Sequence, residues 1–239
     1  MSRQLAPEAA ETLKPGSEHY RAYVGPPKRY GLMTLQQMSL LGALGLEETD
    51  AVLDFGCGSL RLGRSLIPFL RPGRYYGLDP VSWLIEDGIE AETGRDLIAL
   101  KEPKFSYNDD FDCTVFGSTF DFIVAQSIVT HAGTPSVKKL FKSAAASLKA
   151  DGLFLLSYLK GEPSAEPPEE PWTYPFNVAY PESILKGLAE DVGLTWLELD
   201  WWHPGATWAA LALDERRLPE STAGLGKNGR VAPRWRAGN

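Results

Sequence analysis

Two glycines that separate a short apolar run from an amphipathic one limit the folds open to this chain. Residues 51–56 read AVLDFG and residues 57–70 read CGSLRLGRSLIPFL. This pattern predicts a buried strand that passes through Gly56 and Gly58 directly into a helix. Because glycine has no Cβ, a ligand can touch the main chain at such a turn. Ligands of open parallel sheets bind beyond the carboxyl ends of the strands. The sequence therefore predicts an α/β fold with a ligand site here.

The rest of the chain alternates between predicted strands and predicted helices. Strands are expected over residues 75–79, 104–108, 120–127 and 152–159. Helices are expected over residues 28–45, 134–152 and 181–193, and over at least the first half of residues 81–100. Two further apolar runs, 194–202 and 207–213, flank the turn residues HPGA and predict a hairpin. Such alternation is typical of a mainly parallel sheet with both faces covered, which here ends in an antiparallel pair.

The apolar spacing also predicts local contacts. The helix over 28–45 is expected to bury one face that carries Leu32, Leu35, Met38, Leu41 and Leu44. Ser82 and Thr134 stand where an N-cap is expected.

A dinucleotide is the first ligand to consider at a glycine turn of this kind. Its fingerprint needs a third glycine three positions after the second, so that the helix can approach the strand. Arg61 stands at that position. The sequence therefore disfavours a nicotinamide-dependent oxidoreductase.

The turn resembles the first motif of the class I S-adenosylmethionine-dependent methyltransferases. That motif is an apolar strand followed by D/E-x-G-x-G, which residues 54–58 match as DFGCG. The family's second motif, an acidic residue that ends the second strand, is matched by Asp79, 21 residues beyond Gly58. The resemblance covers residues 48–213 and is greatest to uncharacterised bacterial members with GCGSLR-type first motifs. It implies a three-layer Rossmann-like methyltransferase fold, with a mainly parallel seven-stranded sheet that ends in an antiparallel hairpin.

The resemblance also implies a site for S-adenosylmethionine. Asp79 would accept hydrogen bonds from the ribose hydroxyls, a charge-assisted interaction, with Pro80 beside it. The backbone of Phe55, Gly56 and Gly58 would face the methionine part of the cofactor.

Further cofactor contacts follow from the same resemblance. Asp54 would lie near the amino group, and one residue among Asn108, Asp109 and Asp110, with Asp109 preferred, would contact the adenine. Arg61 either pairs with the cofactor carboxylate or is a solvated first-turn arginine. The residues that end the fourth strand would look towards the sulfonium and the substrate; they are Gln126 and Ser127.

Catalytic and substrate-binding candidates are less sharply marked. His131 follows the fourth strand, and its near-neutral pKa suits a general base, although a histidine at this place more often caps the turn before Thr134. Positioning alone can also drive methyl transfer, so that no base is needed. The candidates for substrate contact come from three places. The N-terminal arm contributes Tyr20 and Tyr23, the proline-rich segment 160–180 contributes Trp172 and Tyr174, and the hairpin turn contributes His203.

The expected organisation has three parts. Residues 1–47 form an arm and helix that cap the cofactor, residues 48–213 form the cofactor-binding domain, and residues 160–180 are an insertion that acts as a lid or is disordered. Residues 214–239 carry six basic and three acidic side chains. They predict a flexible tail that is solvated or that binds an acidic surface.

Composition excludes several classes of function. The net charge of −7 disfavours binding to nucleic acid or to an anionic membrane. No apolar stretch is long enough to span a membrane and the first residues do not resemble a signal peptide, so a cytoplasmic protein is expected. Two cysteines and three scattered histidines predict no metal site.

The expected function is methyl transfer from S-adenosylmethionine to an oxygen or nitrogen atom of a small or medium-sized organic acceptor, with S-adenosylhomocysteine as product. A peptide or protein acceptor, and a non-catalytic subunit that binds the cofactor, remain alternatives. The sequence does not indicate an oligomeric state.

Overall fold

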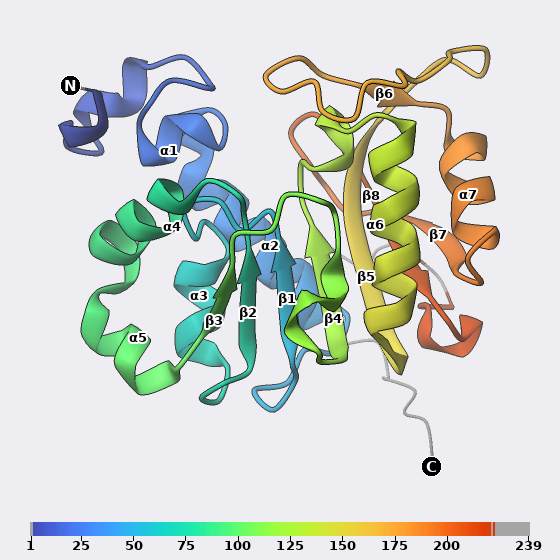
Figure 1. Cartoon of the computed structure of the whole chain (residues 1–239), viewed down its shortest axis with the longest axis horizontal. Helices are drawn as coiled ribbons and strands as arrows, with labels where there is room; N and C mark the ends of the chain where they lie inside the picture. Colours follow the sequence, from blue (N-terminus) through green and yellow to red (C-terminus); the bar gives the residue numbers. More distant parts are fainter. Residues whose placement is uncertain (1, 221, 223–239) are drawn as a thin grey trace.

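A mixed sheet forms the centre of the molecule (Figure 1). The structure, a computed structural model, describes residues 2–220 and residue 222. The strands follow the order β3-β2-β1-β4-β5-β8-β7, and β6 pairs with β5 outside this path. The strands are β1 (Val52–Phe55), β2 (Tyr75–Leu78), β3 (Lys104–Ser106), β4 (Phe120–Ala125), β5 (Leu148–Lys160), β6 (Ala179–Tyr180), β7 (Thr195–Leu199) and β8 (Thr207–Ala212).

The direction of the strands confirms the predicted fold class. Strands β3, β2, β1, β4 and β5 are parallel, whereas β8 runs antiparallel to both β5 and β7. The sheet has eight strands rather than the expected seven, because Ala179 and Tyr180 in the insertion pair with the end of β5. A two-residue strand next to prolines has too little apolar pattern to be recognised from sequence.

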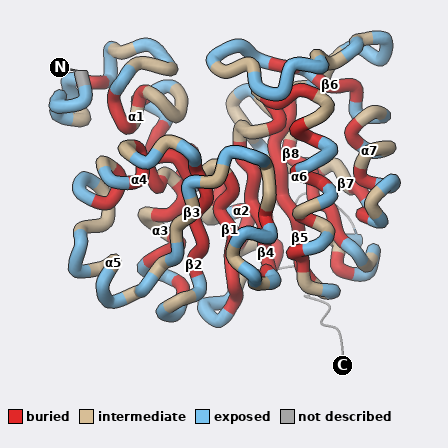
Figure 2. The backbone as a smooth tube through the Cα atoms, in the orientation of Figure 1, coloured by how far each residue is buried: buried red, intermediate tan, exposed pale blue. Residues whose placement is uncertain are grey.

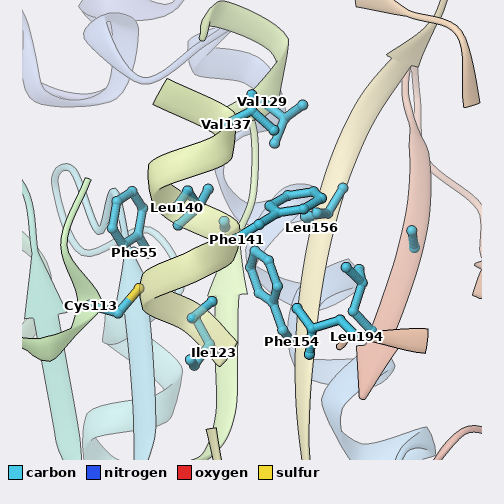
Figure 3. Close-up of a cluster of buried hydrophobic side chains, with 14 of the residues drawn as sticks. Phe55, Cys113, Ile123, Val129, Val137, Leu140, Phe141, Phe154, Leu156 and Leu194 are labelled. Atoms are coloured by element: carbon cyan, nitrogen blue, oxygen red, sulfur yellow. The ribbon is translucent and has the colours of Figure 1, made fainter. Parts of the chain in front are cut away.

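Helices cover both faces of the sheet. They are α1 (Tyr20–Tyr23), α2 (Tyr30–Ala43), α3 (Gly63–Phe69), α4 (Ser82–Gly88), α5 (Arg95–Lys101), α6 (Thr134–Ser147) and α7 (Glu182–Glu190). One apolar core lies between the sheet and α6 and α7, where Phe141 packs edge-to-face on Phe154 (Figure 3). The other core lies between the sheet and α2, α3 and α4. The central strands are buried, whereas α5 on the outside contains no buried residue (Figure 2).

Only part of the face that the sequence predicts for α2 is buried. Leu41 and Leu44 are buried and Met38 packs against the core, as predicted. Leu32 and Leu35 are 45% and 66% exposed. The helix instead turns Thr34 and Gln36 inward, where their side chains donate to the backbone carbonyls of Arg61 and Trp202 at 2.6 and 2.7 Å. Buried carbonyls of the turn and of the β7–β8 connection need donors, and this requirement outweighs burial of the two leucines.

The glycine turn is longer than predicted. Helix α3 begins at Gly63 rather than at residue 57, because the backbone is left-handed at Gly56 (φ 75°), Gly58 (φ 51°) and Leu60 (φ 60°). Such residues cannot lie inside a right-handed helix. Arg61 therefore belongs to the turn and not to the first helical turn.

Both predicted N-caps are replaced by other groups. At α4 the side chain of Ser82 makes no capping bond, and the Asp79 carboxylate accepts the N–H of Val81 instead. At α6 the N-cap residue is Gly133 rather than Thr134. The insertion supplies the acceptors there, because the carbonyls of Pro171 and Pro168 accept the N–H groups of these two residues. The bonds from the insertion to α6 are tertiary and have no local sequence signal, whereas Asp79 and Val81 are only two residues apart.

The tail expected from residue 214 falls largely outside the described residues. Within the described part, Arg217 is buried and donates to the carbonyls of Asp151 and Leu44. The packed part of the chain therefore extends beyond residue 213. Among the described residues, no helix has the length and apolar character that crossing a membrane requires.

A glycine substitution tests how closely α4 approaches the glycine turn. A Cβ at Gly88 would overlap the backbone carbonyl of Ser59, whereas a Cβ at Gly187 in α7 would meet nothing within 4 Å. We expect Gly88→Ala to lower the free energy of unfolding by about 1–3 kcal/mol, as overpacking does. Gly187→Ala should raise it by about 0.5–1 kcal/mol, since alanine favours the helix. Urea denaturation measures both, and equal effects would contradict the packing described here.

Candidate functional site

A small hollow lies at the carboxyl ends of β1 and β4, beside the glycine turn. Four predicted site residues line it, namely Asp54, Gly56, Arg61 and Gln126. The other lining residues are Val24, Gln37, Cys57 and Leu62. The position is the one at which ligands bind in open parallel sheets.

Asp79 lies next to this hollow and holds the turn in place. One carboxylate oxygen accepts the N–H of Gly58 at 2.9 Å, and the other accepts the N–H of Val81 at 2.9 Å. The side chain is buried, and burial raises the pKa of Asp79 while the two amides lower it. An ionised carboxylate has about four acceptor positions, so two remain for a ligand.

Asp54 is the second buried carboxyl group of the site. It accepts a hydrogen bond from the Tyr75 hydroxyl at 2.8 Å. Burial raises the pKa of Asp54 to about 7, against the lowering effect of Tyr75 and of the nearby Arg61 charge. Asp54 therefore titrates near neutral pH.

Arg61 crosses the hollow and joins the arm to the end of β4. Its guanidinium donates to the Val24 carbonyl at 2.6 Å and to Oε1 of Gln126. Burial lowers the pKa of Arg61, and the charges of Tyr30 and Asp54 oppose this effect. Both of these hydrogen-bond acceptors are uncharged, so an anion that enters the hollow can compete for the Arg61 guanidinium.

His203 reaches the same group of residues from the β7–β8 connection. Its Nε2 lies 3.5 Å from Nε2 of Gln126, whose amide donates to Ser127 Oγ at 2.6 Å. The His203 Nδ1 accepts the N–H groups of Gly205 and Ala206 at 3.2 and 2.8 Å. Burial, with the charges of Arg61 and Arg29, lowers the pKa of His203 to about 4, so the ring is neutral at pH 7.

Apolar side chains fill the space directly over the two motif glycines. A Cβ at Gly58 would lie 2.6 Å from Cγ1 of Val24, and a Cβ at Gly56 would overlap Ile128. The hollow therefore has a volume of only about 20 Å³, far below the roughly 300–1,000 Å³ of typical ligand pockets. The glycines provide a surface that a ligand can touch only after these side chains move.

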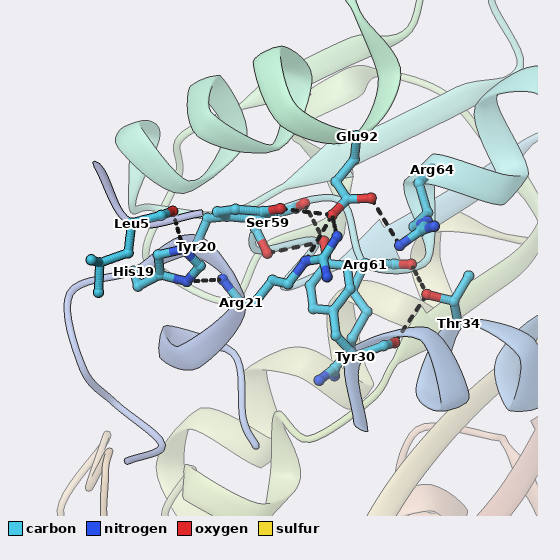
Figure 4. Close-up of polar contacts among 10 residues, drawn as sticks. All are labelled: Leu5, His19, Tyr20, Arg21, Tyr30, Thr34, Ser59, Arg61, Arg64 and Glu92. Atoms are coloured by element: carbon cyan, nitrogen blue, oxygen red, sulfur yellow. Dashed lines mark hydrogen bonds and ion pairs between the residues drawn. The ribbon is translucent and has the colours of Figure 1, made fainter. Parts of the chain in front are cut away.

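The N-terminal arm is held over the turn by Glu92, whose side chain is 4% exposed (Figure 4). Glu92 belongs to the π-helical turn Ile89–Thr93. Its carboxylate pairs with Arg21 of the arm at 2.6 Å and with Arg64 of α3 at 2.8 Å, and accepts the Tyr20 hydroxyl at 3.0 Å. Tyr20 thus contributes to anchoring and does not line the hollow.

Aromatic rings connect the arm to the insertion. The Tyr23 ring packs on Trp83 and on Tyr174, each with centroids 5.4 Å apart, and the Tyr174 hydroxyl donates to the Tyr23 carbonyl. Trp172 stacks on Tyr174 at 6.3 Å, and His131 packs edge-on against Tyr174 at 5.0 Å. Arm and insertion both lie beyond the carboxyl ends of the parallel strands (Figure 1).

His131 is tied to the insertion. Its Nδ1 donates to the Phe176 carbonyl at 2.9 Å, since a carbonyl can only accept. Burial lowers the pKa of His131, and this hydrogen bond raises it. The residue does not line the hollow, and it belongs to the aromatic group of the insertion.

Two predicted cofactor residues are exposed. Pro80 follows β2, and Asp109 lies in the loop after β3; neither lines the hollow. In the described part of the chain, no group of three or more histidine, cysteine, aspartate or glutamate side chains could hold a metal ion.

Sequence reasoning missed several residues that shape the site. Val24 and Ile128 cover the glycines, Tyr75 binds Asp54, Gln37 lines the hollow and Glu92 anchors the arm. A valine, an isoleucine or a glutamate within a helical or strand pattern carries no signal of such a role. For the arm itself, the signal was the resemblance to the methyltransferase family, which implies a segment before the fold that closes over the cofactor.

Comparison with known proteins agrees with this architecture. Residues 29–199 match the family described as methyltransferase domain. The chain belongs to this family, and its sheet with a terminal antiparallel pair has the fold of the class I S-adenosylmethionine-dependent methyltransferases.

Three solved structures illustrate the similarity of fold. An O-methyltransferase family protein from Burkholderia thailandensis is 16% identical (TM-score 0.55), and the match covers 77% of this chain and 57% of that one. Magnesium protoporphyrin IX methyltransferase from Synechocystis, with bound S-adenosylhomocysteine, is 15% identical (TM-score 0.57; 77% and 86% covered). An S-adenosylmethionine-dependent methyltransferase from Clostridium acetobutylicum is 13% identical (TM-score 0.58; 86% and 96% covered). This chain thus spans little more than half the length of the first.

Removing the anchor of the arm should loosen it selectively. We expect Glu92→Gln to lower the free energy of unfolding by about 1–3 kcal/mol, because hydrogen bonds to a buried charge are lost. Amide hydrogen exchange should quicken over residues 16–25. The control is Glu48→Gln, which breaks an exposed pair with Arg71 and should cost about 0–1 kcal/mol. Unchanged exchange in the arm of the Glu92 variant would contradict its anchoring role.

The raised pKa of Asp54 predicts a pH dependence of stability. The folded protein favours the protonated carboxyl group, so stability is full below about pH 4 and falls as the pH rises through about 7. Asp54→Asn removes this titration. Between pH 4 and 8 the wild type should lose about 2–4 kcal/mol relative to the variant. Denaturant titrations across this range measure the difference, and parallel profiles would show that Asp54 is not destabilised by burial.

Proposed function

We propose that this protein transfers a methyl group from S-adenosylmethionine to an oxygen or nitrogen atom of an organic acceptor. The observation that carries the proposal is the meeting of Gly56, Gly58, Asp79 and Arg61 at one edge of a methyltransferase-type sheet. When bound, the cofactor supplies a methyl group activated by a positively charged sulfur. The side chains present match the cofactor's polar groups.

Each polar group of the site has a role in this proposal. The remaining acceptor positions of Asp79 take the ribose hydroxyls, and Arg61 takes the carboxylate of the methionine part. The carboxyl group of Asp54 lies near the amino group. Gln126 and Ser127, at the end of β4, face the reacting atoms. Asp109 and Pro80 complete the adenine side only if the loops that carry them close on the cofactor.

Binding of the cofactor requires the arm to move. Val24 occupies the space over Gly58, and Arg61 holds the Val24 carbonyl. A carboxylate that takes the donors of Arg61 competes directly with this carbonyl. The arm would then close again over the bound cofactor, with Tyr23 next to Asp79. Burial, and to a smaller extent the charge of Asp79, raise the pKa of Tyr23.

The aromatic insertion supplies the acceptor site in this proposal. Trp172 and Tyr174 offer flat apolar faces next to the arm, which suits a small or medium-sized acceptor with an aromatic or apolar part. The neutral Nε2 of His131 can accept a proton because Nδ1 carries the hydrogen bonded to Phe176. His131 is thus the candidate general base, and in-line positioning of the acceptor is the alternative that needs no base.

Calorimetry of the full chain with S-adenosylmethionine tests the proposal, after mass spectrometry for co-purified cofactor. We expect Asp79→Asn to weaken binding at least tenfold, because a charge-assisted hydrogen bond contributes about 1.5–3 kcal/mol. Asp96→Asn, at an exposed position of α5, is the control and should bind as the wild type does. Melting temperatures exclude a general loss of folding.

A fragment of the cofactor separates the two ends of the site. 5′-Methylthioadenosine retains the ribose and lacks the carboxylate, so Asp79→Asn should weaken its binding and Arg61→Gln should not. S-adenosylmethionine should bind more weakly to both variants. No binding to folded, cofactor-free wild type at millimolar concentration would overturn the proposed function.

A further inference from the structure

Two hydrogen-bond donors face each other at the edge of the hollow. Nε2 of Gln126 and Nε2 of His203 are 3.5 Å apart, and they come from the end of β4 and from the β7–β8 connection. Whether this contact is a hydrogen bond depends on which atoms carry protons. The neighbouring contacts settle this for both side chains.

The orientation of the Gln126 amide follows from Arg61. A guanidinium has donors only, so the amide atom that it contacts must be the oxygen Oε1. The amide nitrogen then has one proton directed to Ser127 Oγ at 2.6 Å and a second proton on the side of His203. Gln126 therefore presents a donor to the histidine.

The tautomer of His203 follows from its own loop. Nδ1 lies 3.2 and 2.8 Å from the backbone nitrogens of Gly205 and Ala206, which are donors, so Nδ1 accepts and carries no proton. Because burial and nearby positive charges keep this ring neutral at pH 7, its proton is on Nε2. His203 therefore also presents a donor, and the contact with Gln126 satisfies neither group.

One oxygen atom would satisfy both donors. Two nitrogens 3.5 Å apart can each lie at an ordinary hydrogen-bond distance of about 2.9 Å from a single acceptor placed between them. The charges that act on His203 are positive, since Arg61 and Arg29 both lower its pKa, and Arg61 also contacts Gln126. The carboxyl group that lines the hollow, Asp54, acts on Arg61 instead. An oxygen that carries negative charge fits this environment best.

We propose that Gln126 and His203 together donate to one ligand oxygen of a carboxylate or other oxyanion, next to Arg61. The proposal deepens the methyl-transfer function and rests on it only for the source of that oxygen. The source is either the carboxylate of the cofactor or an acidic group of the acceptor. In the second case the acceptor is an anion, and the donor pair orients it beside the reacting carbon.

Two variants separate the donors from the loop that carries them. In His203→Asn the side-chain oxygen can still accept hydrogen bonds from the N–H groups of Gly205 and Ala206. The asparagine side chain is too short to donate a hydrogen bond towards Gln126. Gln126→Glu replaces the second donor by an acceptor for both Arg61 and His203. It should raise the melting temperature and lose oxyanion binding, an opposite pair of effects that general damage does not produce. Trp202→Phe, at an exposed neighbour, is the control.

The ligands are S-adenosylmethionine, its decarboxylated analogue, and benzoate added to protein saturated with S-adenosylhomocysteine. If the oxygen belongs to the cofactor, both variants bind S-adenosylmethionine about tenfold more weakly and bind the decarboxylated analogue as the wild type does. If it belongs to the acceptor, only benzoate binding falls, by a similar factor. Unchanged binding of all three ligands would overturn the proposal.

The tautomer provides a test that does not depend on the cofactor. Nitrogen-15 correlation spectra of the ligand-free protein should show His203 protonated at Nε2, and benzoate should shift this signal. Protonation at Nδ1 would overturn the proposal. If the wild type binds neither S-adenosylmethionine nor S-adenosylhomocysteine, the methyl-transfer function fails. Benzoate alone then tests the donor pair. Weaker binding of benzoate to His203→Asn than to the wild type would support the proposal, and equal binding would overturn it.

Discussion

The carboxylate of Asp79 is the interaction on which the geometry of the site depends. It ends β2, and its two oxygens accept one N–H from the glycine turn and one from the start of α4. A buried carboxylate costs free energy unless donors surround it. The left-handed backbone at Gly58 and the N-terminus of α4 supply those donors. One side chain thus joins strand, turn and helix, and it still has acceptor positions on the side of the hollow.

The arm covers the hollow through Val24, and the insertion lies against the arm. The arm is anchored by Glu92 and by the contact of Arg61 with the Val24 carbonyl. The insertion is anchored by its carbonyls, which accept the first N–H groups of α6. Tyr174 joins the two segments through Tyr23. Of these contacts, the one between Arg61 and the Val24 carbonyl lies at the hollow. In the proposed function the cofactor carboxylate competes for Arg61, so that ligand binding and release of the arm are coupled.

The alternating pattern was sufficient to predict the parallel sheet, the hairpin and the place of the glycine turn. It failed where side chains form hydrogen bonds with backbone groups that are distant in the sequence. Thr34 and Gln36 face inward in α2 because carbonyls of the turn and the β7–β8 connection need donors, and Leu32 is left outside. The first helix after the turn begins six residues late because Leu60 is left-handed. The carboxyl and glycine residues of the candidate site followed from motif spacing, whereas Val24, Ile128 and Glu92 carried no local signal.

The sequence by itself determined the order of strands and helices, since apolar periodicity and glycine positions are local properties of the chain. It also determined which residues end β1 and β2, and hence where Asp54 and Asp79 meet the turn. Only the tertiary structure decided that His203 faces Gln126, that Arg61 spans the hollow, and that Val24 of the arm covers Gly58. These contacts join residues 34 to 77 positions apart. Their partners are chosen by how the sheet, the arm and the β7–β8 connection pack together.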